Sequence, residues 1–161
     1  MPNWLYLAAN VLYHLGLALW IGGVIALGAL TAPALFRALP RPQAGSIFGP
    51  ILRRFARLRL VALALVLAGA GAKYFIWESH ATSTSSGIWI AIRWAAIAVM
   101  AATLLYEILH LERAIEARRR ELTLEMPDDD PRRRAFNVLH KRAENLMRLS
   151  LLAALIAEFL S

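Results

Sequence analysis

Residues 5–35 read LYLAANVLYHLGLALWIGGVIALGALTAPAL and contain no Asp, Glu, Lys or Arg. An α-helix rises about 1.5 Å per residue, so about 20 apolar residues are enough to cross the hydrocarbon core of a bilayer. This stretch is longer than that, and it predicts a transmembrane helix. The residues before it, Met1-Pro2-Asn3-Trp4, lack the basic segment of a cleavable signal peptide, so we expect the helix to be retained.

Three more apolar runs follow, and 59% of the 161 residues are hydrophobic. A soluble domain of this size carries less apolar side chain. We therefore predict one all-α domain, an integral membrane four-helix bundle of up-down topology. The fourth apolar run, residues 149–160, is short, so its helix must begin earlier among polar residues. The expected transmembrane segments are residues 4–35, 58–78, 88–110 and 143–161.

The basic residues predict the orientation of the bundle. The first connection carries six arginines and no acid, the third is also rich in arginine, and the second, residues 78–87, has no Lys or Arg. Because cytoplasmic loops are enriched in Lys and Arg, the first and third connections should face the cytoplasm of a cell membrane. Both termini should then lie outside it. The same distribution accounts for the net charge of +7, so no nucleic-acid partner is expected.

The two cytoplasmic connections have different expected structures. Apolar and Arg residues alternate at helical spacing over residues 46–57, which predicts a short interfacial helix lying on anionic headgroups. Residues 111–142 should form a helical hairpin that extends the third and fourth helices into the cytoplasm. Pro127 should end its first arm, and Asp129 or Asp130 should cap its second arm at Pro131. The expected ion pairs between the arms are Arg113 with Glu144 and Glu116 with Lys141.

Small residues at a spacing of four are typical of closely packed transmembrane helices. Three such series occur here, and they predict helix contacts at Ala18, Gly22 and Ala26, at Ala64, Ala68 and Ala72, and at Ala91 and Ala95.

Ionisable side chains at bilayer depth are costly and indicate functional sites. Four of them fall in the half of the predicted bundle away from the arginine-rich connections, and we call them the outer-half polar cluster: His14, Lys73, Arg93 and Glu158. Glu158 should turn inward toward one of the three others, because an unpaired carboxylate in hydrocarbon is strongly unfavourable. The alternatives are that Lys73 and Arg93 extend to the outer interface, that Glu158 is hydrated, and that His14 bonds a neighbouring helix.

A second group lies at the expected inner boundary, and we call it the inner-boundary polar cluster: Glu107, His110, His140, Asn145 and Arg148. Its members form either the solvated base of the hairpin or a site where His110 or His140 binds a metal or a headgroup. No helix carries two histidines at metal-ligand spacing, so no metal site is assigned.

The sequence has no motif for a catalytic nucleophile, a phosphate-binding loop or a dinucleotide, and it has no cysteine. These observations do not favour an enzyme, and they exclude disulfides and thiolate chemistry within the chain.

Several segments resemble the transmembrane protein 205-like family, whose bacterial members are classed as domain of unknown function 4149. The resemblance rests most specifically on Leu35-Phe36-Arg37-Ala38-Leu39-Pro40-Arg41, and next on Phe136-Asn137-Val138-Leu139-His140 with Asn145. It implies a four-helix membrane protein, linked in animals to tolerance of platinum drugs and without an established catalytic activity. The matching residues are His14, Trp20, Gly22, Pro33, Phe36, Arg37, Glu112, Arg113, Phe136, His140 and Asn145.

We therefore expect a non-catalytic membrane protein with a transport-associated, stress-tolerance or accessory-subunit role and no cofactor, either as a homo-oligomer or within a larger membrane complex. The first helix also resembles copper-resistance protein D and the HemJ-type protoporphyrinogen oxidases at His14, Gly16, Trp20, Gly22 and Gly23. That resemblance implies the alternative, a protein that binds haem, porphyrin or a transition metal through His14. Its difficulty is depth, because His14 is expected near the midplane and His110 and His140 near the inner boundary.

Overall fold

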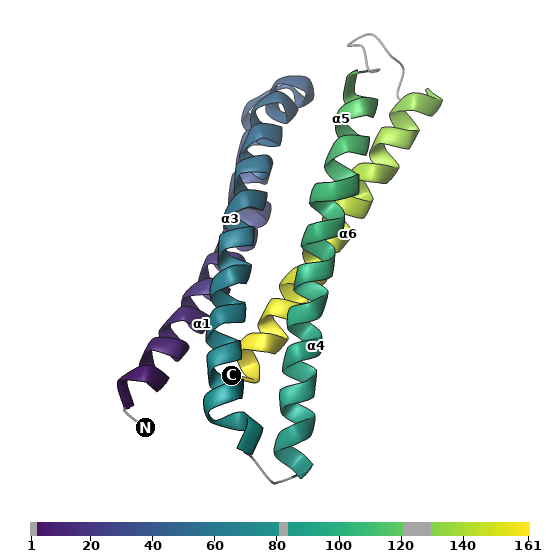
Figure 1. Ribbon diagram of the computed structural model, residues 1–161. Helices are drawn as coiled ribbons and strands as arrows, with labels where there is room; N and C mark the ends of the chain where they lie inside the picture. Colours follow the sequence, from purple (N-terminus) through teal and green to yellow (C-terminus); the bar gives the residue numbers. More distant parts are fainter. Residues whose placement is uncertain (1–2, 81–83, 121–129) are drawn as a thin grey trace.

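A computed structural model describes residues 3–80, 84–120 and 130–161, and the described part contains helices and no strands (Figure 1). The first long helical segment comprises α1, a π-helical segment η1 and α2, at Asn3–Ile25, Ala26–Thr31 and Ala32–Ala38. The second is α3, at Arg41–Ile76, which a short 3₁₀ turn η2 follows at Glu78–His80. The third comprises α4, a π-helical segment η3 and α5, at Thr84–Tyr106, Glu107–Leu111 and Glu112–Arg120. The last is α6, at Pro131–Phe159.

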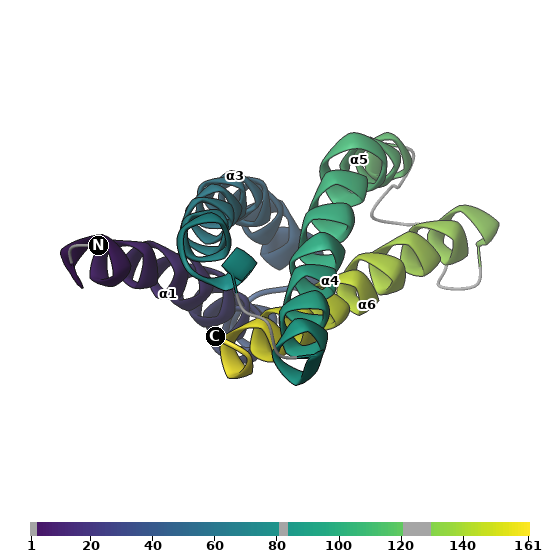
Figure 2. The same cartoon turned by 60° about the horizontal axis from the view of Figure 1, so that its bottom comes forward.

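The helices are arranged as two pairs. One pair is α1 with α3 and the other is α4 with α6, and within each pair the helices pack against each other (Figures 1 and 2). The pairs are joined where the C-terminal part of α6 contacts α1 and where α3 contacts α4. At the opposite end, the beginning of α3 and the end of α5 lie apart in both views.

Proline and aspartate residues mark where two helices begin. Pro42 lies in the first turn of α3, where the missing amide hydrogen costs nothing. Asp130 is the N-cap of α6, its carboxylate accepts a 2.8 Å hydrogen bond from the Arg132 amide, and Pro131 is the first helical residue. The cap at Asp130 therefore agrees with the sequence prediction. Pro127 and Asp129 lie outside the described residues.

The separate interfacial helix expected at residues 46–57 is not present, because these residues are the first part of the continuous helix α3. Their buried side chains continue the buried face of the membrane-length part, from Ala44 through Phe55 and Ala56 to Ala62 and Val66. Because this buried face is continuous, the helix continues through these residues without a break. Pro50, nine residues from the start, is accommodated within it.

Both π-helical segments occur where the α-helical pattern is locally disturbed. The segment η1 precedes Pro33, whose ring would clash with the carbonyl four residues earlier in a regular helix. Within η3 the amide of Glu112 bonds the carbonyl of Glu107, five residues back. Such wide turns are often found at functional sites, and η3 begins at the buried acid Glu107.

Within the part of the chain that the structure describes, three helices are long and apolar enough to cross a membrane: residues 4–38, 43–76 and 87–118. The outward faces of these helices are apolar, with Leu7, Val11 and Leu15 exposed along one side of α1. Exposed apolar side chains at a helical repeat suit contact with lipid better than contact with water. The chain is thus an all-α protein of membrane type. The fourth helix, α6, is not among the three.

The tightest helix contact is the crossing of α1 and α3. A Cβ atom on Gly16 would lie 2.6 Å from the Ala62 carbonyl oxygen, and one on Gly69 would lie 2.6 Å from the Ala9 carbonyl oxygen. These two glycines therefore let the two backbones touch. On the same faces, Tyr13, Leu17 and Trp20 of α1 are fully buried.

The small residues predicted to make the close contacts are mostly on other faces. Ala18, Gly22, Ala26, Ala64, Ala68, Ala91 and Ala95 are exposed, and Ala72 is half-buried. Helices rich in alanine and glycine carry small residues at a spacing of four on several faces at once. The packed face is determined instead by the large residues that flank Gly16 and Gly69.

We predict that Gly69→Ala destabilises the protein and that Gly71→Ala does not. The new methyl group at residue 69 would overlap the α1 backbone, whereas nothing lies within 4 Å of the corresponding position at residue 71. Overpacking costs about 1–3 kcal/mol, and alanine in an open helical position gains about 1 kcal/mol over glycine. Thermal unfolding in detergent measures both. Equal melting temperatures for the two variants would contradict the close contact at Gly69.

Candidate functional site

The outer-half polar cluster contains a direct contact between α1 and α6. The Nδ1 atom of His14 lies 3.1 and 3.2 Å from the two carboxylate oxygens of Glu158. The side chains are 44% and 43% exposed, so the pair lies at the surface of the helix bundle rather than within it. Of the three partners expected for Glu158, the structure selects His14.

Tyr13, the neighbour of His14, links α1 to the same end of α6. Its hydroxyl donates a 2.6 Å hydrogen bond to the carbonyl oxygen of Ala157. That carbonyl is in the last turn of α6, where no amide of the helix remains to bond it. The Nζ atom of Lys73 on α3 lies 5.1 Å from the centre of the Tyr13 ring, which places a buried cation over an aromatic face.

Arg93 of α4 is buried and pairs with Glu78 of η2, the turn that follows α3. The sequence prediction placed Arg93 and Lys73 as candidate partners of Glu158, but Arg93 is held by an acid outside the predicted cluster. Side chains from α1, α3, η2, α4 and α6 thus form three polar contacts at this end of the molecule. They are His14 with Glu158, Lys73 with Tyr13, and Arg93 with Glu78.

The chemical capacity of this arrangement lies in its titratable groups. Histidine is the side chain that changes its charge most readily in the physiological pH range, and a carboxylate beside it can accept a hydrogen bond from its ring nitrogen. Among the described residues, no group of three or more His, Asp or Glu side chains could hold a metal ion.

A second ion pair, Arg59 with Glu107, is completely inside the protein. Nη2 of Arg59 on α3 lies 2.6 Å from Oε1 of Glu107, the first residue of η3. The Arg59 side chain is 1% exposed and that of Glu107 is 12% exposed. The sequence prediction counted Arg59 among the arginines of the cytoplasmic connection. That placement is wrong, because its guanidinium is buried between the two helix pairs.

Aromatic rings enclose this ion pair. The Cζ atom of Arg59 lies 5.5 Å from the ring centre of Trp20 and 5.2 Å from that of Phe55. A Cβ atom on Gly23 would lie 2.2 Å from a carbon of the Phe55 ring, so a glycine is needed there for Phe55 to pack. Within the described residues, Nε and Nη1 of Arg59 have no hydrogen-bond partner. The positive charge of Arg59 is therefore compensated by Glu107 and by the faces of the Trp20 and Phe55 rings.

The other members of the inner-boundary polar cluster make contacts with residues of their own helices. His110 lies against Tyr106, His140 stacks on Phe136, and Arg148 pairs with Glu144. His110, His140, Asn145 and Arg148 are exposed. In the described part of the chain, these side chains do not gather around Glu107 as one site.

Two acids of the predicted hairpin ion pairs, Glu144 and Glu116, contact basic residues other than the expected ones. Glu144 pairs with Arg148 on its own helix, and Glu116 lies 3.4 Å from Arg53 of α3. A residue four positions away on one helix is always within reach of a long side chain, and this local partner competes with one across a hairpin. Arg113 is exposed at the start of α5, and Lys141 is exposed on α6.

Sequence reasoning missed four residues of these sites: Tyr13, Arg59, Glu78 and Trp20. A signal existed for Glu78, since it follows an apolar run and lies near Lys73 in a connection without basic residues. Arg59 had a weaker signal, because it is followed directly by the apolar residues 60–72. No pattern within the sequence pairs Arg59 with Glu107, 48 positions away.

We predict that Glu107→Ala destabilises the protein strongly and that replacing both Arg59 and Glu107 by Met restores much of the loss. Removing one partner leaves a buried charge uncompensated, at a cost of about 3–5 kcal/mol, whereas an apolar pair carries no such penalty. Glu144→Ala is the control, because an exposed pair contributes about 0.3–0.5 kcal/mol. Thermal unfolding in detergent compares the variants. A loss for Glu107→Ala no greater than for the control would contradict the buried pair.

The comparisons with known proteins identify a family and do not add an activity. No curated protein and no solved structure matches the chain. The family described as Domain of unknown function (DUF4149) matches residues 15–123, which include Trp20, Arg59 and Glu107. The match covers more than half of the chain, so this membrane-type helical protein belongs to the DUF4149 family.

Proposed function

We propose that this protein is a non-catalytic, multi-pass membrane protein with a transport-associated role, and that the outer-half polar cluster exchanges protons in that role. The observation that carries the proposal is the contact of His14 with Glu158 between α1 and α6, with both side chains half exposed. A titratable pair that is accessible and also joins two helices can change a helix contact when it gains or loses a proton.

The surrounding groups support this role over a merely structural one. Lys73 and Arg93 bury two positive charges at the same end of the bundle, 5% and 3% exposed. Ionisable residues between transmembrane helices are typical of proton and ion pathways in pumps and transporters. The contact of Tyr13 with Ala157 keeps α6 beside α1 when the charge of the neighbouring pair changes.

Proton exchange predicts a specific effect of removing either partner. Liposomes that contain the purified protein and an internal pH-sensitive dye should equilibrate an imposed pH difference faster than empty liposomes. We expect Glu158→Gln and His14→Gln to reduce this protein-dependent rate by about a hundredfold, the lower end of the usual contribution of an acid–base group. Glu144→Gln is the matched control, because it removes an exposed acid of the same helix. Equal rates in wild-type and empty liposomes would refute the proposal.

The proposed topology has four crossings, with both termini outside the cytoplasm and the arginine-rich ends of α3 and α5 inside. The charge distribution supports it, since exposed arginines occur in the first half of α3, at residues 53, 54 and 57, and in α5, and these segments lie toward the end of the molecule away from the N-terminus (Figure 1). Burial of Ser150, Ala153, Ala154 and Ala157 supports a crossing by α6, because small residues allow its short apolar part to pack closely on its neighbours.

This topology predicts the behaviour of fusions at Ser161. Alkaline phosphatase, which is active only outside the cytoplasm, should be active there, and a fluorescent protein that folds only in the cytoplasm should be dark. The reverse result would show that the orientation is inverted.

A second candidate function is binding of haem or a transition metal by His14. The observation in its favour is that Glu158 contacts Nδ1, because a carboxylate that bonds one ring nitrogen commonly orients the other toward a metal. His110 and His140 do not share its surroundings, since they contact Tyr106 and Phe136 instead. A Soret band in the absorbance of the purified protein that is lost in His14→Gln would favour this candidate over proton exchange.

A further inference from the structure

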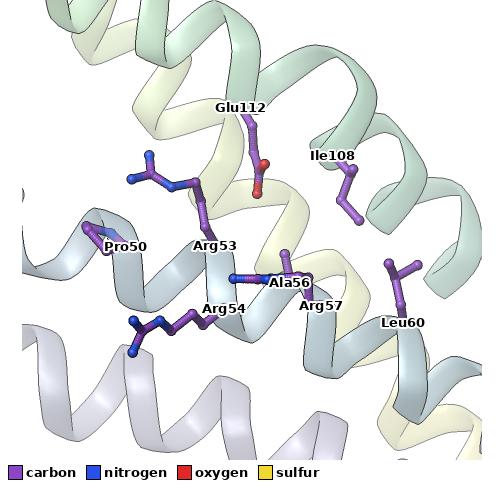
Figure 3. Close-up of a pocket in the computed structure, with 8 residues that line it drawn as sticks. All are labelled: Pro50, Arg53, Arg54, Ala56, Arg57, Leu60, Ile108 and Glu112. Atoms are coloured by element: carbon purple, nitrogen blue, oxygen red, sulfur yellow. The ribbon is translucent and has the colours of Figure 1, made fainter.

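A groove of about 310 Å³ lies between α3 and the η3–α5 segment, away from the outer-half polar cluster (Figure 3). It occupies the region where the two helix pairs diverge (Figure 1). Its lining comes from one side of α3, between Pro50 and Leu60, and from Ile108 and Glu112 on the facing segment.

The groove carries a net positive charge. Three arginines line it, Arg53, Arg54 and Arg57, against one lining acid, Glu112, and Arg53 also pairs with Glu116 outside the lining. The next arginine of α3, Arg59, does not add to this charge because Glu107 neutralises it inside the protein. Arg54 and Arg57 are exposed, and neither forms an ion pair with any described residue. Guanidinium groups that are exposed and not engaged in an ion pair are suited to bind phosphate oxygens.

Polar and apolar residues are separated along the groove. The arginines lie at one end, and Leu60 and Ile108 line the other end (Figure 3). The change follows the helix axis, since α3 runs from its arginine-rich part into the apolar residues 60–72. This is the same order in which a bilayer passes from headgroups to acyl chains. A small soluble anion would use the charged end and leave the apolar end empty, whereas an amphiphile would use both.

We propose that this groove binds one anionic phospholipid, with its phosphate on Arg53, Arg54 and Arg57 and the start of an acyl chain against Leu60 and Ile108. Glu112 points from its own helix toward α3 (Figure 3), where its carboxylate can accept a hydrogen bond from a headgroup hydroxyl. The ligand is therefore an anionic phospholipid whose headgroup carries hydroxyl groups, such as phosphatidylglycerol. Basic pockets between transmembrane helices recognise headgroups in this way. The proposal is independent of proton exchange at His14 and Glu158.

The experiment measures retention of lipid by the purified full-length protein in detergent, by native mass spectrometry. Wild-type protein should retain one phosphatidylglycerol in preference to phosphatidylcholine. The variant Arg54→Gln/Arg57→Gln removes two charges without breaking an ion pair among the described residues, and its retention should be weaker by about tenfold or more. That is the scale of one lost charge-assisted hydrogen bond.

Two further variants and a competitor distinguish a lipid site from general surface charge and from a site for a soluble anion. Arg134→Gln/Arg142→Gln removes the same charge from exposed positions of α6 and should retain the lipid as wild type does. Leu60→Gln changes the apolar end alone and should also weaken retention. Soluble glycerol phosphate should compete poorly for the lipid site.

An equal loss of lipid retention in both double variants would mean that general surface charge binds the lipid. Full competition by glycerol phosphate, with no effect of Leu60→Gln, would mean that the groove binds a soluble anion. Either result would overturn the proposal, and so would equal retention of the two lipids.

If Arg54→Gln/Arg57→Gln does not fold, the single variant Arg57→Gln answers the same question. Its melting temperature without added lipid should equal that of wild type, and its melting temperature should respond less to phosphatidylglycerol. An unchanged response would also overturn the proposal.

Discussion

The positive charge of a guanidinium group that is buried away from water needs a compensating partner beside it, and the guanidinium of Arg59 is buried in this way. Its one carboxylate partner among the described residues, Glu107, belongs to the other helix pair, so the compensation requires the two pairs to stay together. Trp20 and Phe55 close the site, and Gly23 leaves the space for Phe55. The packing of residues from α1, α3 and η3 at this place thus depends on the charge of Arg59. A weaker constraint, such as apolar packing alone, would let the pairs slide, because lipid is as apolar as the helix faces.

The helix pairs are joined at two places along the molecule by contacts of different character. Arg59 with Glu107 is enclosed, and arginine does not lose its charge at physiological pH, so this contact is permanent. His14 with Glu158 is half exposed, so this contact is accessible from outside the bundle. In our proposal, proton exchange changes the helix contact at this accessible pair while Arg59 with Glu107 keeps the helix pairs together. Our proposed role for the outer-half polar cluster uses this difference.

The sequence predicted the helical class, the membrane-length helices and the start of α6 at Asp130 and Pro131, because apolar length and capping are local properties. It also placed Glu158 level with His14, and the two side chains are in contact. It failed where the outcome depends on which face of a helix packs. The residues spaced four apart that include Gly22 are exposed, whereas Gly16 and Gly69 form the crossing of α1 and α3. Likewise, Arg59 is buried, whereas Arg57, two residues earlier, is exposed. Which face of a helix packs depends on how large side chains from neighbouring helices fit together, and residue spacing alone does not determine this fit.

The π-helical turn at η3 has a consequence for how this chain tolerates insertions and deletions. One residue corresponds to about 100° of rotation in an α-helix. The π-helical turn holds one residue more than an α-helical turn, so deleting one residue between Glu107 and Leu111 would return the turn to regular winding and leave α5 with nearly the same face toward α3. Glu112 and Glu116 would then still face α3, whereas a deletion elsewhere in the helix would rotate them away from it. Alignment of related chains should therefore treat a single gap at this turn as compatible with the same surface of α5, and a gap elsewhere in the helix as a change of that surface.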